Sequence, residues 1–118
     1  MSRIRTAVLL LIWFAISTQA GSPRLSEDAA LDRLLRTLKH DHVYQHRISI
    51  DCISFSTEET THAYFQFLLR ENHTPKCGGD PETMPAIDRY RVFRGSKKLE
   101  RFNPVDDQWE AYHSGLNR

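Results

Sequence analysis

The chain has almost no excess of charge of either sign. Sixteen Lys and Arg residues stand against 15 Asp and Glu residues, which gives a formal net charge of +1 with His neutral. Arg3 and Arg5 lie in a segment that we expect to be removed, so the mature charge falls to −1. A positive field that would attract nucleic acid or an anionic membrane is absent at that charge. We therefore expect no nucleic-acid partner.

No apolar run is long enough to span a bilayer. Ala7 to Ser17 is uncharged over about 11 residues, whereas a spanning helix needs about 20. The basic start followed by this run and by Thr18-Gln19-Ala20 is typical of a signal peptide over 1–20 with cleavage after Ala20. The sequence thus predicts a single exported domain over 21–118, periplasmic or secreted, with no stable membrane anchor after cleavage.

Motifs of catalysis are also lacking. None of the serines stands in a Gly-x-Ser-x-Gly turn. The Gly78-Gly79 pair has no helix after it whose N-terminus would hold a phosphate. We predict a protein that is not an enzyme and that uses no cofactor.

Cysteine is scarce, because Cys52 and Cys77 are the only two. Export would place them in an oxidising compartment, where such a pair forms a disulfide. A bridge that closes a loop of about 26 residues stabilises the fold by about 3.5 kcal/mol in the chain-entropy model. The alternative, a reactive thiol or half of a metal site, stays open at this point.

The first element after the leader is a helix predicted over 26–40. Ser26 can cap its free amides, and four leucines follow at the i, i+3, i+4 and i+7 positions of one apolar stripe. These are Leu31, Leu34, Leu35 and Leu38. The stripe needs a partner surface, which the face of a sheet would supply.

Four strands are predicted after the helix. A two-residue alternation starts at Arg47 and changes phase near Cys52, which indicates either a bulge there or an outer face that is also partly covered. A polar turn follows over 56–61. Further strands are expected over 62–70, 87–94 and 97–102, with Gly95-Ser96 as a hairpin turn. Trp109 and Tyr112 lie in a tail that we expect to fold back as a cover. The predicted fold class is α+β: one N-terminal helix packed on a curved antiparallel sheet of about four strands, with one disulfide.

A long loop over 71–85 connects the second and third predicted strands. It holds three prolines, and long ordered loops of this kind are often functional. If the flanking strands pair, Arg70 and Glu71 come near Asp88 and Arg89, so ion pairs are expected at the base of the loop. These charges can serve only to hold the loop, or they can present it to a protein partner. The candidate partner-binding residues are Arg70, Glu71, His73, Gly78, Gly79, Asp80, Glu82, Asp88, Arg89 and Arg91.

The order of helix and strands resembles the cystatin-like group of small exported domains, including the PepSY-like ones. The run Cys77-Gly78-Gly79-Asp80-Pro81, followed by Pro85, Asp88 and Arg89, is similar to a run in small uncharacterised exported bacterial proteins. The Gln-Val-Gly hairpin motif of inhibitory cystatins is missing. Protease inhibition is therefore not implied by the resemblance.

Two functional hypotheses follow. The first is an exported, non-enzymatic binding or inhibitor-like domain, including one that neutralises a toxin or hydrolase in the bacterial envelope, with a disulfide-braced charged loop as its contact surface. The alternative is a small periplasmic metal- or ligand-binding protein that uses His42 and His46. No cysteine or glutamate near these histidines completes a ligand set, so no metal site is assigned. Asn72-His73-Thr74 is formally a glycosylation acceptor.

Overall fold

A computed structural model describes residues 12–16 and 23–114 of the chain. The predicted signal peptide lies outside the described residues except for 12–16, which have no regular secondary structure. Among the residues that are described, no helix has the length and apolarity needed to cross a membrane.

The helix α1 spans Glu27–His40 and begins as the sequence predicts. The Ser26 hydroxyl accepts a hydrogen bond from the Ala29 amide at 3.3 Å, and this caps the helix. Its fully buried line consists of Ala30, Leu34 and Leu38, which are four residues apart. The predicted leucine stripe is thus confirmed at its centre, whereas Leu31 and Leu35 are only half-buried along its flank.

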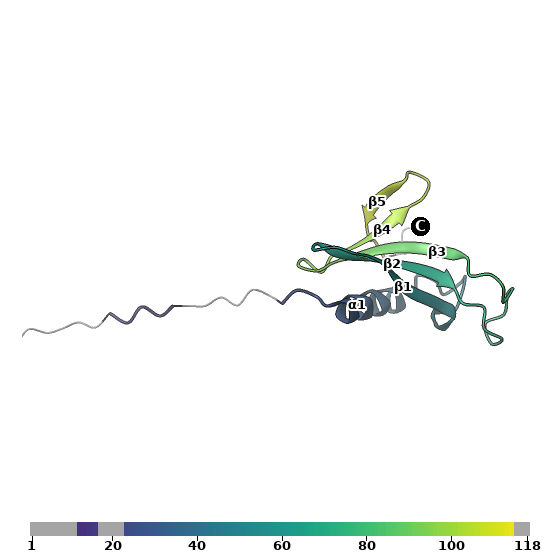
Figure 1. The fold of residues 1–118 in the computed structure, drawn as a ribbon, viewed down its shortest axis with the longest axis horizontal. Helices are drawn as coiled ribbons and strands as arrows, with labels where there is room; N and C mark the ends of the chain where they lie inside the picture. The colour runs from purple at the N-terminus through teal and green to yellow at the C-terminus, as the bar shows by residue number, and fades with distance from the viewer. Residues whose placement is uncertain (1–11, 17–22, 115–118) are drawn as a thin grey trace, which may run out of the picture.

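Five antiparallel strands form one sheet, in which each strand pairs with its neighbours in chain order. They are β1 (Ile53–Thr60), β2 (Tyr64–Glu71), β3 (Ala86–Phe93), β4 (Leu99–Asn103) and β5 (Gln108–Ala111). Helix α1 covers one face, and β4 and β5 rise on the side away from it (Figure 1). The α+β class is confirmed, with five strands in place of about four.

The first predicted strand is displaced along the chain. Residues 41–47 form turns, Ile50–Cys52 is a short 3₁₀ helix, and β1 starts only at Ile53. The polar segment 56–61, predicted as a turn, lies almost entirely within β1. Strand β1 pairs with β2 from Ile53↔Glu71 to Thr60↔Phe65. Strand pairing here overrides the local polar composition. The bulge lies between Thr57 and Glu59 rather than near Cys52.

The C-terminal tail contains the strand that the sequence prediction missed. Trp109 faces Phe102 across the β4–β5 pair, while Tyr112 packs against the core on the helix side. Both residues fold back onto the sheet, Tyr112 against the core and Trp109 over Arg91 on the opposite face. In the β3–β4 turn, the residue in the left-handed conformation is Lys97 (φ 63°) and not Gly95.

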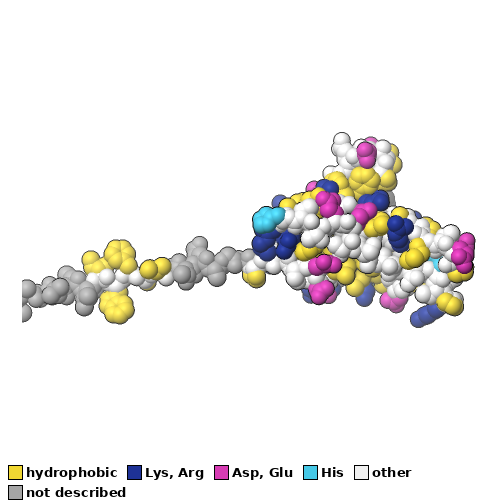
Figure 2. All heavy atoms as spheres, in the orientation of Figure 1, with side chains coloured by type: hydrophobic (Ala, Val, Ile, Leu, Met, Phe, Trp, Pro, Cys, Tyr) yellow, Lys and Arg dark blue, Asp and Glu magenta, His cyan; other side chains and the backbone are white. Residues whose placement is uncertain are grey.

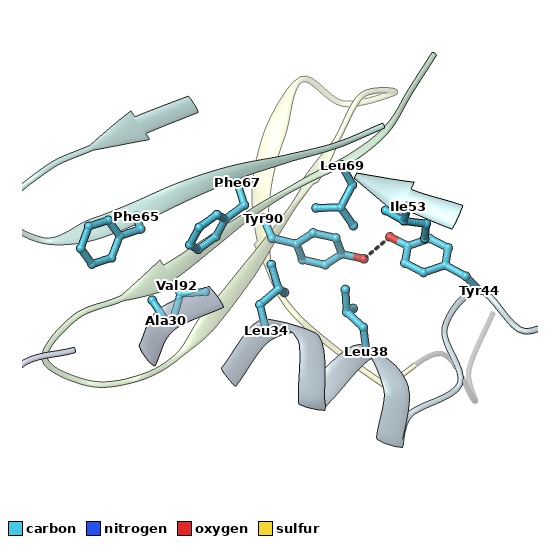
Figure 3. Packing of buried hydrophobic residues seen from close by; sticks show 10 residues of the cluster. All are labelled: Ala30, Leu34, Leu38, Tyr44, Ile53, Phe65, Phe67, Leu69, Tyr90 and Val92. Atoms are coloured by element: carbon cyan, nitrogen blue, oxygen red, sulfur yellow. Dashed lines mark hydrogen bonds between the residues drawn. The ribbon is translucent and has the colours of Figure 1, made fainter. Parts of the chain in front are cut away.

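The hydrophobic core lies between α1 and the sheet (Figure 3). From β2 it takes Phe65, Phe67 and Leu69, the face that the alternation of the sequence predicts. Tyr90 and Val92 of β3 are likewise fully buried. This layer fixes β2 and β3, and so fixes both ends of the loop between them.

Candidate functional site

The loop over 72–85 is tied to the sheet by a disulfide between Cys52 and Cys77. Their Cα atoms are 5.7 Å apart, so the middle of the loop is joined to the residue that precedes β1. The Asn72 amide donates to the Cys52 carbonyl at 2.8 Å, which adds a hydrogen bond beside the crosslink. The predicted disulfide is confirmed, and it indicates an oxidising environment for the folded protein.

Backbone hydrogen bonds shape the loop on each side of the crosslink. The Cys77 and Gly78 amides both donate to the Thr74 carbonyl at 3.0 Å. Gly78 and Gly79 then take positive φ angles of 74° and 85°, which glycine adopts without strain. The Glu82 amide donates to the Asp80 carboxylate at 2.9 Å, an Asx turn.

The His73 side chain joins the two limbs of the loop. Its Nδ1 lies 2.6 Å from the Asp80 carbonyl oxygen, and its Nε2 lies 2.8 Å from Oε2 of Glu71. The ring also packs against Gly79, where an added Cβ would come within 2.7 Å of it. The hydrogen bond to the Asp80 carbonyl and then the one to Glu71 raise the pKa of His73.

The ion pairs predicted at the base of the loop do not form, and this prediction is wrong. Asp88 and Arg89 are neighbours on β3 and point to opposite faces of the sheet. Arg70 opposes Ala86 after a register shift, and its guanidinium donates to the Met84 carbonyl at 3.0 Å. The ten predicted partner-binding residues are therefore divided between the loop and two faces of the sheet.

On the helix-covered face, Asp88 belongs to a polar cluster that the sequence did not reveal. The Tyr44 hydroxyl donates to Asp88, and the Tyr44 and Tyr90 hydroxyls are 2.7 Å apart (Figure 3). Arg101 donates to both Asp88 oxygens, at 2.7 and 3.3 Å. Burial raises the pKa of Tyr44, and the neighbouring Tyr90 and Asp88 raise it further, so Tyr44 stays a neutral donor.

The other face of the sheet carries an arginine held between two aromatic rings. The Arg91 guanidinium lies 4.3 Å from the Tyr64 ring centre and 3.9 Å from that of Trp109, and it donates to Gln66 at 3.0 Å. In a flat sheet β2 and β5 would be about 14 Å apart. One guanidinium reaches rings on both strands because β4 and β5 curl over this face. Beside it, Arg89 pairs with Glu58 at 3.0 Å.

The histidines of the alternative hypothesis lie after α1 and are exposed to solvent. His42 has a positive φ of 50°, and His46 forms a hydrogen bond with its neighbour Gln45 at 2.9 Å. Across residues 12–16 and 23–114, no three His, Cys, Asp or Glu side chains are grouped to hold a metal. His42 does line a cavity of about 290 Å³, together with Leu38, Tyr44 and Ile48, but His46 does not.

Charges of both signs are interspersed with apolar side chains on the face of the domain shown in Figure 2. No family model, curated protein or solved structure matches this chain. The loop offers exposed hydrogen-bonding and apolar groups at Lys76, Glu82 and Met84 on a braced backbone.

Proposed function

We propose that this chain is an exported, non-enzymatic binding domain whose contact surface is the loop over 72–85. The proposal rests on one observation: the side chains of that loop are exposed to solvent while its backbone is held to the sheet. Residues 74–76 and 78–85 are all exposed, yet the disulfide and His73 hold the segment to the sheet. A loop ordered in advance loses less conformational entropy on binding, and this favours tight contact with a partner.

The partner that we propose is a protein, since the loop is an exposed surface with mixed chemistry. Lys76, Glu82 and Met84 present a cation, a carboxylate and an apolar side chain whose exposed fraction is 47%. Interfaces between proteins combine such groups around a well-packed centre. A toxin or hydrolase of the cell envelope is the partner class that we propose, in agreement with the predicted export.

Replacement of the loop tests the proposal. The variant exchanges 78–84 for a Gly/Ser linker and keeps Cys77, while the matched control exchanges the exposed turn 104–107 in the same way. Both are used as bait in envelope extracts, and captured enzymes are assayed with and without the purified domain. We expect wild type and control to retain and inhibit a partner that the loop variant loses. Equal capture by all three baits contradicts the proposal.

A second candidate function rests on the cavity of about 290 Å³ that His42 lines. Its walls include Leu38, Tyr44, Ile48 and Ile50, so it would take a small, largely apolar ligand. Native mass spectrometry of the purified protein decides this. A bound small molecule or metal that a His42→Ala variant loses supports the candidate, and a spectrum of the bare polypeptide removes it.

A further inference from the structure

The nearest group to each ring nitrogen of His73 only accepts hydrogen bonds. The Thr83 hydroxyl lies farther from Nδ1, at 3.4 Å, and donates to the Asp80 carbonyl at 3.2 Å. The Asp80 carbonyl oxygen, 2.6 Å from Nδ1, has no proton to give. Oε2 of Glu71, 2.8 Å from Nε2, has none either while the carboxylate is ionised. A neutral imidazole carries a single N–H and can satisfy only one of them. Both bonds form together only when the ring is an imidazolium.

The two bonds join the end of a strand to the far limb of the loop. Glu71 is the last residue of β2, and Asp80 lies beyond Cys77. The His73 side chain is only 13% exposed, so a lost bond is poorly replaced by water. The Asp80 carbonyl also accepts hydrogen bonds from the Thr83 amide and hydroxyl, both at 3.2 Å. Loss of the bond from His73 would therefore also affect the turn at 80–83.

We propose that His73 is a pH-dependent latch, which closes the loop over 72–85 when protonated and loosens it when neutral. The charged groups that act on the ring are Glu71, from β2, and Asp80, from the far limb of the loop. Both favour the imidazolium, and the raised pKa of His73 agrees with the geometry. A raised pKa means that the stabilisation is fully present below about 6.5, the value of an unfolded His, and is lost as pH rises through the folded value.

The consequence for binding rests on the proposed function, whereas the latch itself does not. A closed loop presents its contact groups in one arrangement, so partner affinity is highest at mildly acidic pH and falls above neutrality. The partner class is thus one met in an acidified extracellular or envelope space.

The Glu71→Gln variant distinguishes a pH-dependent role of His73 from a purely structural role. The side-chain amide that this substitution introduces can donate to Nε2 of a neutral ring, whose Nδ1–H still reaches the Asp80 carbonyl. Both bonds then persist without the imidazolium, so the loop stays closed at every pH. Glu82→Gln is the matched control, because it removes a carboxylate from the same loop without touching His73.

The experiment follows the His73 ring by NMR between pH 5 and 9, together with the exchange protection factors of the Gly78 and Thr83 amides. In wild type and in Glu82→Gln we expect the protection factors of these amides to fall about tenfold as the pH rises, with the same midpoint as the titration of the His73 ring. A fall of this size corresponds to the loss of one charge-assisted hydrogen bond. In Glu71→Gln it should not vary. Flat protection in wild type, or an unchanged pH dependence in Glu71→Gln, overturns the latch. The capture experiment is repeated at pH 5 and at pH 9. If the NMR results support the latch but no partner is captured at either of these pH values, the proposed function is contradicted and the latch is not.

Discussion

The core under α1 and the loop over 72–85 are held by different forces. In the core, Leu34, Phe67 and Tyr90 are fully buried, and their order comes from the removal of apolar surface from water. Most loop residues are exposed, and their order comes from one crosslink and a set of hydrogen bonds. We therefore expect the arrangement of the core to persist when the crosslink is reduced or the pH changes, and the loop to respond to both.

This difference indicates how a thin domain can present a surface loop that is held in place. A chain of about 100 residues buries only about two thirds of the surface that its unfolded form exposes. Its core is used to fix β2 and β3, and the loop between them takes its rigidity from Cys77 and His73. Perturbing each region separately tests whether the two are as independent as this account requires.

The largest effect is expected in the core. Phe67→Ala leaves a cavity beside Tyr90 and should lower the free energy of unfolding by about 3–5 kcal/mol, measured by urea denaturation. Phe102→Ala on the half-buried opposite face is the control, with a smaller loss expected. Equal losses for the two variants would mean that the two faces of the sheet are packed alike.

Removal of the crosslink should come next. A Cys52→Ser, Cys77→Ser double variant is expected to lose about 3.5 kcal/mol of unfolding free energy, because the unfolded chain regains the entropy of its closed loop. The chemical shifts of Phe67 and Tyr90 should stay native-like in this variant. Loss of the native core signals would show that the loop and the core are not separate.

A smaller loss is expected from the polar cluster of the core. Tyr44→Phe removes the donor to Asp88 and should cost about 1–3 kcal/mol, because a largely buried carboxylate is left with one partner fewer. In Tyr64→Phe the lost hydroxyl lies 3.5 Å from Glu59 at an exposed position, and the cost should be below about 0.5 kcal/mol. Denaturation of both variants at neutral pH measures the difference, and similar costs would contradict the assignment.

The sequence predicts the helix and the central strands because these depend on local signals. It predicts the disulfide because the chain has only two cysteines and carries a predicted export signal. Leu34 and Leu38 repeat at helical spacing, and Phe65, Phe67 and Leu69 alternate as in a half-buried strand. The start of β1 was misplaced because Ile48 and Ile50 also alternate with polar residues. Only the pairing of 53–60 with β2 decides which segment becomes the strand.

For the candidate site, the sequence proposes residues but does not predict the contacts between them. The register shift between Leu69 and Arg70 decides whether Asp88 pairs with Arg70 or with Arg101. No local sequence pattern predicts this shift. The position of Arg91 between Tyr64 and Trp109 depends on the curl of β4 and β5. The contact of His73 with Asp80 follows from the path of a loop closed by Cys77, so it too is a tertiary property.

The most direct test of the account is the backbone dynamics of 78–84 before and after selective reduction, measured as ¹⁵N heteronuclear NOEs. We expect values for the oxidised loop close to those of β2, and a marked fall in the loop alone once Cys52 and Cys77 are separated. Values for the oxidised loop already as low as those of a free terminus, or values that reduction leaves unchanged, would contradict the claim that the disulfide makes this surface rigid.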